Sequence, residues 1–108
     1  MKIDGMVALV TGAAMGIGKA ICQMLLENGA KGVCLVDLVD VGHRTAAELA
    51  SKYGDGRTIF VKADVTNKEQ LEAAFVQTRQ QFGRLDIVAS NAGVMTEVNY
   101  EMMINVNL

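Results

Sequence analysis

The chain has 108 residues, of which 51% are hydrophobic and 20% are charged, and it carries a net charge of −2. A chain of this size forms one domain and can bury roughly 60 to 70% of its unfolded surface, which excludes intrinsic disorder. The weakly negative charge without a basic cluster argues against nucleic-acid binding. The longest uncharged run, from Gly5 to Gly18, is shorter than the about 20 apolar residues that span a membrane.

Cysteine usage and the amino terminus favour a cytoplasmic protein. Cys22 and Cys34 are too few for a disulfide scaffold, and neither stands in a Cys-x-x-Cys pair or beside the lone His43. We therefore expect two buried free thiols and no metal site. Asp4 interrupts the charged start of the chain and the following apolar run gives way to glycine, which is unlike a signal peptide.

The first predicted unit is a strand followed by a helix. The continuous apolar run from Met6 to Val10 has the length of a strand buried on both faces, and it ends at Thr11-Gly12. From Gly16 onward, apolar residues recur at helical spacing, and Asn28-Gly29 supplies a helix stop. The recurring residues are Ile17, Ala20, Ile21, Met24 and Leu25.

The same unit then repeats twice. Val33–Val36 predicts a second strand that stops at Asp37, and a helical pattern follows it. Thr58–Val61 predicts a third strand, and Thr66 with Glu69 matches the capping box that opens a helix. The predicted inner positions of these two helices are Ala46, Leu49, Ala50, Tyr53, Leu71, Ala74, Phe75, Thr78 and Phe82.

The last part of the chain predicts a fourth strand at Leu85–Ala89, a loop at Ser90–Gly93 and a further helical pattern from Tyr100 to Leu108. Strands and helices that alternate through short connections indicate a parallel sheet covered by helices. The sequence therefore predicts an α/β fold, a Rossmann-type doubly wound parallel sheet built as β-α-β-α-β-α-β plus the start of another helix. Residues 1–108 would form the N-terminal part of one such domain.

The predicted strands end at one edge of the sheet, where open α/β sheets bind ligands. Between the first strand and its helix lies Thr11–Gly18, which has glycine at positions 12, 16 and 18. The missing side chains let a pyrophosphate approach the amide groups and the favourable dipole of the helix N-terminus. A tight strand-to-helix connection without a ligand is the alternative.

Asp37 strengthens the case for a dinucleotide. It follows Gly18 at close to the roughly 20-residue spacing expected for a carboxylate that accepts the adenosine ribose hydroxyls. The same charge would repel the 2′-phosphate of NADP, and no Lys or Arg stands within Thr11–Gly18 to offset it. NAD is therefore favoured. A solvated carboxylate in the same turn as Asp40 is the alternative for Asp37.

These motifs resemble the classical short-chain dehydrogenase/reductase family across essentially the whole chain. The family's Thr-Gly-x-x-x-Gly-x-Gly turn corresponds to Thr11–Gly18, its adenine-side Asp-Val pair to Asp64-Val65, and its Asn-Ala-Gly loop to Asn91–Gly93. One departure is Ser90, where members usually carry asparagine. The resemblance implies that NAD is contacted by Gly12, Ala14, Gly16, Ile17, Gly18, Asp37, Leu38, Ala63, Asp64, Val65, Asn91, Ala92 and Gly93.

The resemblance also implies roles for individual residues. Asp64 and the Val65 backbone would contact adenine, and Asn91 would steady the central strand beside the cofactor. Asn107 corresponds to the family's catalytic asparagine, which holds a water in a proton relay, whereas the nearby Asn105 does not. A buried asparagine that bends a helix is the alternative for Asn107.

The family's catalytic Tyr-x-x-x-Lys pair is absent from these 108 residues. In that pair the lysine lowers the tyrosine pKa, so that the hydroxyl exchanges a proton with the substrate oxygen. Tyr53 and Tyr100 are followed four positions later by Arg57 and Ile104, and the usual catalytic serine is missing too. The sequence thus resembles the first half of an oxidoreductase, as in a fragment or a short isoform.

Three functional hypotheses follow. The complete protein would be an NAD-dependent oxidoreductase of a secondary alcohol or ketone, such as a hydroxylated fatty-acid derivative, and complete family members are commonly homo-oligomers. Alternatively, the chain would be a non-enzymatic module that holds NAD or pairs with another subunit. A third hypothesis is that it does not fold alone, because its fourth strand would leave an open apolar edge. No membrane or nucleic-acid partner is expected.

Overall fold

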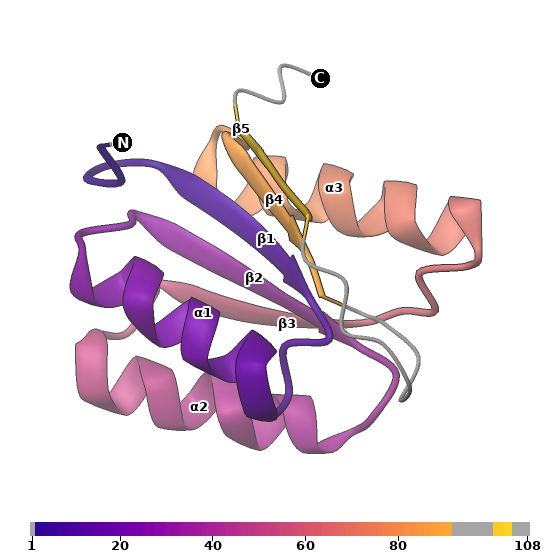
Figure 1. The fold of residues 1–108 in the computed structure, drawn as a ribbon, viewed down its shortest axis with the longest axis horizontal. Coiled ribbons are helices and arrows are strands. Elements are labelled where there is room, and N and C mark those ends of the chain that lie inside the picture. Colours follow the sequence, from indigo (N-terminus) through magenta and orange to yellow (C-terminus); the bar gives the residue numbers. More distant parts are fainter. Residues whose placement is uncertain (1, 92–100, 105–108) are drawn as a thin grey trace.

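The protein is a single sheet with helices on both faces (Figure 1). The computed structural model describes residues 2–91 and 101–104. In chain order the elements are β1 Val7–Thr11, α1 Gly16–Glu27, β2 Gly32–Asp37, α2 Val41–Tyr53, β3 Thr58–Lys62, α3 Lys68–Phe82, β4 Ile87–Ser90 and β5 Glu101–Ile104. The strand order is β3-β2-β1-β4-β5, with β1 to β4 parallel. This confirms the predicted Rossmann-type doubly wound sheet.

The central strands are buried on both faces because their side chains are apolar along the run. All of β1 and the first five residues of β2 are buried. Alternate side chains of β1 enter different halves of the core: Ala8 and Val10 join the cluster under α1 and α2, whereas Val7 and Leu9 join the cluster on the α3 side. Burial of one such valine or leucine contributes roughly 1.5 to 3 kcal/mol, so the paired central strands anchor the domain.

The order of the strands explains which helix covers which face. Crossovers between parallel strands are right-handed. The chain moves outward from β1 to β3 and then returns past β1 to β4, so α1 and α2 cover one face and α3 covers the other (Figure 1). The reversal creates a switch point between β1 and β4, the position where open α/β sheets bind ligands. No helix that the structure describes is long and apolar enough to cross a bilayer.

The inner face of α1 differs from the one that apolar spacing predicted. Ile17 and Met24 are 46% and 37% exposed. The helix has few polar residues, so spacing alone does not define its inner side, and the packing of Gly18 against the main chain of Gly12 decides it. The residues that α1 buries are Gly18, Cys22, Leu25 and Leu26.

The start of α3 lies one residue later than the predicted capping box. Asn67, not Thr66, is the N-cap, and its side-chain oxygen accepts a hydrogen bond from the Gln70 amide at 3.1 Å. The Thr66 hydroxyl instead donates to Asp64 Oδ1 at 2.6 Å. The Thr66 side chain is directed toward the Asp64 carboxylate, and Asn67 supplies the cap of α3.

Arg57, which precedes β3, fastens the ends of α1 and α2. Its guanidinium donates to the carbonyl oxygens of Leu26, Ala30 and Tyr53, at 2.8, 2.7 and 2.8 Å respectively. Carbonyl groups in the last turn of a helix lack an intrahelical partner, and a positive charge there is favourable. One side chain therefore joins both helices at the end of the sheet opposite to the glycine turn.

The segment predicted as a helix from Tyr100 to Leu108 contains β5, so that prediction is wrong for Glu101–Ile104. The strand pairs antiparallel with β4, placing Ile104 opposite Ile87 and Glu101 opposite Ser90. An uncovered β4 would present a row of unpaired amide and carbonyl groups. Pairing with that edge outweighs the helical spacing of so short an apolar segment.

A reciprocal contact fixes β4 beside β1. The Asp86 amide donates to the Val7 carbonyl oxygen at 2.9 Å, and the Val7 amide donates to Asp86 Oδ2 at 2.9 Å. Arg84 donates to both carboxylate oxygens at 2.7 Å. The Arg84 guanidinium, helped by the Val7 amide, holds the pKa of Asp86 below its ordinary value.

We expect Asp86→Asn to lower the free energy of unfolding by about 1 to 3 kcal/mol at pH 7, the scale of a hydrogen bond to a charged group. Because the folded state has the lower pKa, this stabilisation is present above about pH 4, the unfolded value, and is lost as pH falls through the folded pKa. Urea unfolding between pH 2 and pH 7 measures both effects. The exposed Asp55→Asn is the control, and equal pH profiles for the two variants would contradict the role of Asp86.

Candidate functional site

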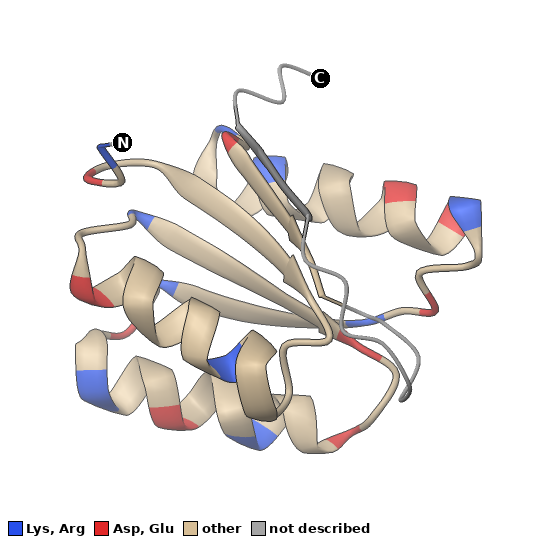
Figure 2. Cartoon of the chain, viewed as in Figure 1, with Lys and Arg blue, Asp and Glu red and all other residues tan. Residues whose placement is uncertain are grey.

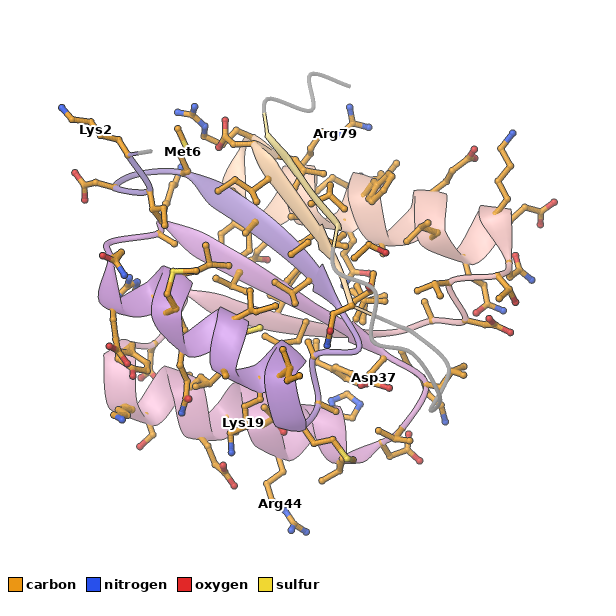
Figure 3. The ribbon with its side chains drawn as sticks, viewed as in Figure 1. Lys2, Met6, Lys19, Asp37, Arg44 and Arg79 are labelled. Atoms are coloured by element: carbon orange, nitrogen blue, oxygen red, sulfur yellow. The ribbon has the colours of Figure 1, made fainter. Side chains whose placement is uncertain are left out.

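The carboxyl ends of the parallel strands bring the predicted site residues to one edge. β1 ends at Thr11, β2 at Asp37 and β3 at Lys62, and Asn91 directly follows β4. In Figure 3, Asp37 lies at this edge, and Figure 2 shows that charged residues of both signs gather where β2 and β3 end. The Lys62 ammonium is already paired, because it lies 3.0 Å from Asp40 Oδ1.

The turn between β1 and α1 uses its three glycines in different ways. Gly12 and Gly16 have φ values of +63° and +59°, in the left-handed region that favours glycine. A Cβ on Gly16 would meet nothing within 4 Å, so the space above this residue is open. A Cβ on Gly18 would overlap the Gly12 carbonyl. Gly18 therefore permits the helix to pack on the turn, whereas Gly16 leaves room for a ligand to approach.

The first turn of α1 is built to receive an anion. Its N-cap is Met15, which provides no side-chain hydrogen bond, and no acidic residue stands in the first turn. The first amide groups of a helix have no intrahelical acceptor and carry the positive end of the dipole. Met15 and Ile17 are 58% and 46% exposed beside them. An anion at this position would satisfy amide donors that the Met15 N-cap leaves without a side-chain acceptor.

Asp37 connects the end of β2 to the glycine turn. Its Oδ2 accepts from the Ala14 amide at 3.0 Å, and its Oδ1 accepts from the Leu38 amide at 2.7 Å. The Ala13 amide also donates to the Val36 carbonyl oxygen at 3.2 Å. The carboxylate is thus held at both oxygens and lies beside the turn that would receive a pyrophosphate, while Leu38 is exposed next to it.

Asp64 stands next to this group because β3 ends beside β2. The Ala63 amide donates to the Asp37 carbonyl oxygen at 3.0 Å, and Ala63 is buried. The Thr66 hydroxyl and amide both donate to Asp64 Oδ1, at 2.6 and 2.9 Å, and they lower the pKa of the Asp64 carboxyl. The partly buried Val65 follows. Asp64 is therefore an ionised acceptor at neutral pH, on the same edge as Asp37.

The loop after β4 is tied to β1 by a residue that the sequence interpretation did not assign to the site. The Asn91 amide donates to the Thr11 hydroxyl oxygen at 2.8 Å. Thr11 is buried at the end of β1, and the sequence signal that could have identified it is a hydroxyl residue placed directly after a continuous apolar run. Ala92, Gly93 and Asn107 lie outside the described residues, as does Asn105.

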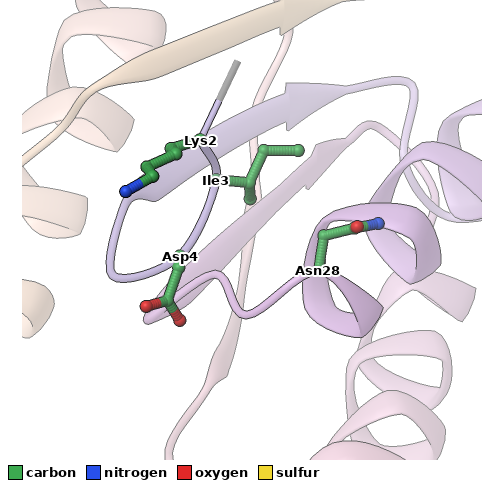
Figure 4. A pocket seen from close by; sticks show the side chains of 4 residues that line it. All are labelled: Lys2, Ile3, Asp4 and Asn28. Atoms are coloured by element: carbon green, nitrogen blue, oxygen red, sulfur yellow. The ribbon is translucent and has the colours of Figure 1, made fainter.

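Other candidate groups lie away from this edge. Burial raises the pKa of Cys22 to about 12 and that of Cys34 to about 11, so neither thiol is a nucleophile at neutral pH; both are free and buried, as predicted. The Tyr53 hydroxyl donates to Glu27 Oε1 at 2.8 Å, near the C-terminal ends of α1 and α2. A cavity near the amino end of β1 is lined by Lys2, Ile3, Asp4 and Asn28 (Figure 4).

Comparison with known proteins assigns the chain to the same family that the glycine turn resembles. The short chain dehydrogenase family model matches residues 6–108. The chain is 46% identical to 15-hydroxyprostaglandin dehydrogenase (NAD(+)) of Mus musculus and 44% identical to that of Homo sapiens, each over 100% of this chain. It covers 40% and 41% of these relatives, so it spans well under half of their length.

Solved structures agree with the fold. A short-chain dehydrogenase/reductase from Burkholderia phymatum in complex with NAD superposes with a TM-score of 0.75 and 28% identity, over 82% of this chain and 31% of that one. A short-chain type dehydrogenase/reductase from Mycobacterium marinum gives 0.77 and 32%, over 86% of this chain and 37% of that one. The family model, the relatives and the glycine turn lead to one conclusion: the chain belongs to the short-chain dehydrogenase family.

Proposed function

We propose that this chain is the adenosine- and pyrophosphate-binding part of an NAD-dependent dehydrogenase. The observation that carries the proposal is the meeting of a helix N-terminus without a side-chain cap, the open Gly16 turn and the Asp37 carboxylate at the carboxyl edge of the sheet. A dinucleotide has an anionic pyrophosphate next to a ribose diol, and this edge offers donors for the first and acceptors for the second. The NAD complex of the Burkholderia phymatum relative supports the choice of ligand.

Individual residues would hold separate parts of the cofactor. The amides at the start of α1, including those of Ile17 and Gly18, would bind the pyrophosphate, and Asp37 would accept from the ribose hydroxyls. Asp64 and the Val65 backbone would contact adenine. Leu38 and Ala63 would flank it, and Asn91 with the two residues that follow would border the cofactor near β4. When bound, the nicotinamide supplies hydride transfer to or from a substrate carbon.

The substrate class comes from the relatives. Two 15-hydroxyprostaglandin dehydrogenases share 46% and 44% identity with this chain, which supports a secondary alcohol on a hydroxylated fatty acid as the substrate of the whole protein, and a role in prostaglandin or related lipid metabolism. Asn107 would be the catalytic asparagine. We place the protein in the cytoplasm, where two free thiols remain reduced, and expect it to form homo-oligomers.

A binding module without chemistry is the second candidate. The observation that favours it is that the groups gathered at the carboxyl edge of the described residues bind and orient, whereas Tyr53 lies far from that edge. Such a module would bind NAD with the same residues and would release it unchanged. NAD binding alone therefore does not separate the candidates, whereas turnover does.

We expect NAD to bind more tightly than NADP, because Asp37 repels the 2′-phosphate. Asp37→Ala should weaken NAD binding by about 1 to 3 kcal/mol, since hydrogen bonds to a charged group are lost, and should narrow the preference for NAD. Isothermal titration calorimetry measures both affinities. Asp55→Ala removes an exposed carboxylate from the turn before β3, at the opposite end of that strand, and should leave NAD binding unchanged. Equal losses in the two variants would show that Asp37 is an ordinary surface charge.

We expect Gly16→Ala to weaken NAD binding by roughly 10- to 100-fold, because a methyl group would stand in the space that the pyrophosphate needs. Gly56→Ala is the matched control: Gly56 also has a positive φ, of +85°, and open space around it, but it lies in the turn before β3. Both variants should lose about 1 to 2 kcal/mol of stability from left-handed strain. A folded Gly16→Ala variant with full NAD affinity would refute the pyrophosphate site.

We expect the 108-residue chain alone to show no dehydrogenase turnover. No tyrosine–lysine pair is present to take the hydroxyl proton, so the roughly 10²- to 10⁴-fold contribution of general acid–base catalysis is missing. The assay follows NADH formation from secondary alcohols, including 15-hydroxy fatty acids, and compares this chain with a version extended by the remaining length of its relatives. Robust turnover by the 108-residue chain would overturn this expectation.

A further inference from the structure

Thr45 joins α2 to the glycine turn through a buried hydrogen bond. Its side chain is only 4% exposed, and its hydroxyl lies 2.6 Å from the Ala14 carbonyl oxygen and 3.3 Å from the Val41 carbonyl oxygen. A hydroxyl has one proton to donate, and 2.6 Å lies within the normal O–H···O range whereas 3.3 Å lies beyond it. The proton therefore goes to Ala14, although a threonine inside a helix commonly bonds within its own helix.

Ala14 passes this restraint on to the Asp37 carboxylate. Its carbonyl group is held by Thr45, and its amide donates to Asp37 Oδ2 at 3.0 Å. The Leu38 amide donates to the other oxygen, Oδ1, at 2.7 Å. Ala14 is itself buried. Two hydrogen bonds in series thus connect α2, through Ala14 of the turn, to the carboxylate at the end of β2.

The number of hydrogen bonds that Asp37 can accept explains why its orientation matters. An ionised carboxylate has about four acceptor sites, two on each oxygen. The amides of Ala14 and Leu38 occupy one on each, which leaves one on each for the two hydroxyls of a ribose diol. If Ala14 shifts, Oδ2 loses its amide and the carboxylate is free to rotate away from the geometry that suits a diol.

We propose that Thr45 is a positioning residue that sets the selectivity of the cofactor site by orienting Asp37 through Ala14. This inference rests on the proposed NAD function. Thr45 itself would not touch the dinucleotide. Its hydroxyl holds Ala14, and the Ala14 amide in turn orients the ribose-binding carboxylate of Asp37.

The test is a double-mutant cycle in the whole protein, read by titration calorimetry with NAD and NADP. Thr45→Val keeps the shape of the side chain and removes the hydroxyl, so NAD affinity should fall by roughly 3- to 10-fold, the value of one hydrogen bond, and the ratio of NAD to NADP affinity should fall with it. Thr45→Ser keeps the hydroxyl, so it should keep both the NAD affinity and the NAD-to-NADP affinity ratio of the wild type. In an Asp37→Ala background, Thr45→Val should change NAD affinity by less than about 2-fold, because its target is gone.

Thr78→Val is the matched control. Thr78 is another buried helical threonine, whose hydroxyl donates to the Ala74 carbonyl oxygen at 2.7 Å, but it lies in α3 on the other face of the sheet. This variant should lose stability to a similar extent and keep the NAD affinity of the wild type. If Thr45→Val does not fold, Thr45→Ala takes its place in the cycle.

The possible results separate a failure of the proposed NAD function from a failure of the proposed role of Thr45. Wild-type protein that binds no NAD would overturn the proposed function and the role of Thr45 with it. Wild-type binding with an unchanged Thr45→Val affinity, or an equal loss with and without Asp37, would overturn only the role of Thr45, since a purely structural effect is additive. A similar loss of NAD affinity in Thr78→Val would overturn it too, because general destabilisation would then explain both variants.

Discussion

The close approach of α1 to the turn before it is the constraint on which the site depends. A side chain at position 18 would overlap the Gly12 carbonyl group, so only glycine allows the helix to begin this near to the end of β1. The contact also fixes the rotation of α1, which turns Cys22 and Leu25 toward the sheet and leaves Ile17 exposed beside the first amides. One absent side chain therefore sets both the packing of the helix and the placement of its positive end.

The sheet brings the remaining groups to that point through contacts between distant parts of the chain. Asp86 and Val7 exchange hydrogen bonds where β1 and β4 begin, and the Asn91 amide donates to the Thr11 hydroxyl oxygen where the two strands end. These contacts hold the switch point at both ends. Because strand order reverses there, the crossovers leave the carboxyl ends of β1 and β4 uncovered by a connecting helix, and a ligand has access to the turn.

Sequence patterns predict the parts of this structure that local physics decides. The apolar runs gave the four parallel strands, and Asn28-Gly29 gave the end of α1, because strand burial and helix stops depend on neighbouring residues. The rest depends on partners far along the chain. The inner face of α1 is chosen by Gly12, and Glu101–Ile104 forms a strand because β4 offers an edge to pair with. The sequence does not predict the role of Thr45, because the Ala14 carbonyl oxygen to which it donates lies far away along the chain, in the glycine turn.

These long-range contacts also determine what the site can do. Binding a dinucleotide requires donors and acceptors that are already in place, since ordering a glycine-rich turn at the moment of binding costs conformational entropy. Three glycines make the turn intrinsically flexible, so its order must come from outside it. Ala13 and Ala14, which lie between the glycines, are held by the end of β2, by Asp37 and by Thr45. The glycines thus provide access for the ligand, and the buried partners of the two alanines provide the order that glycine cannot.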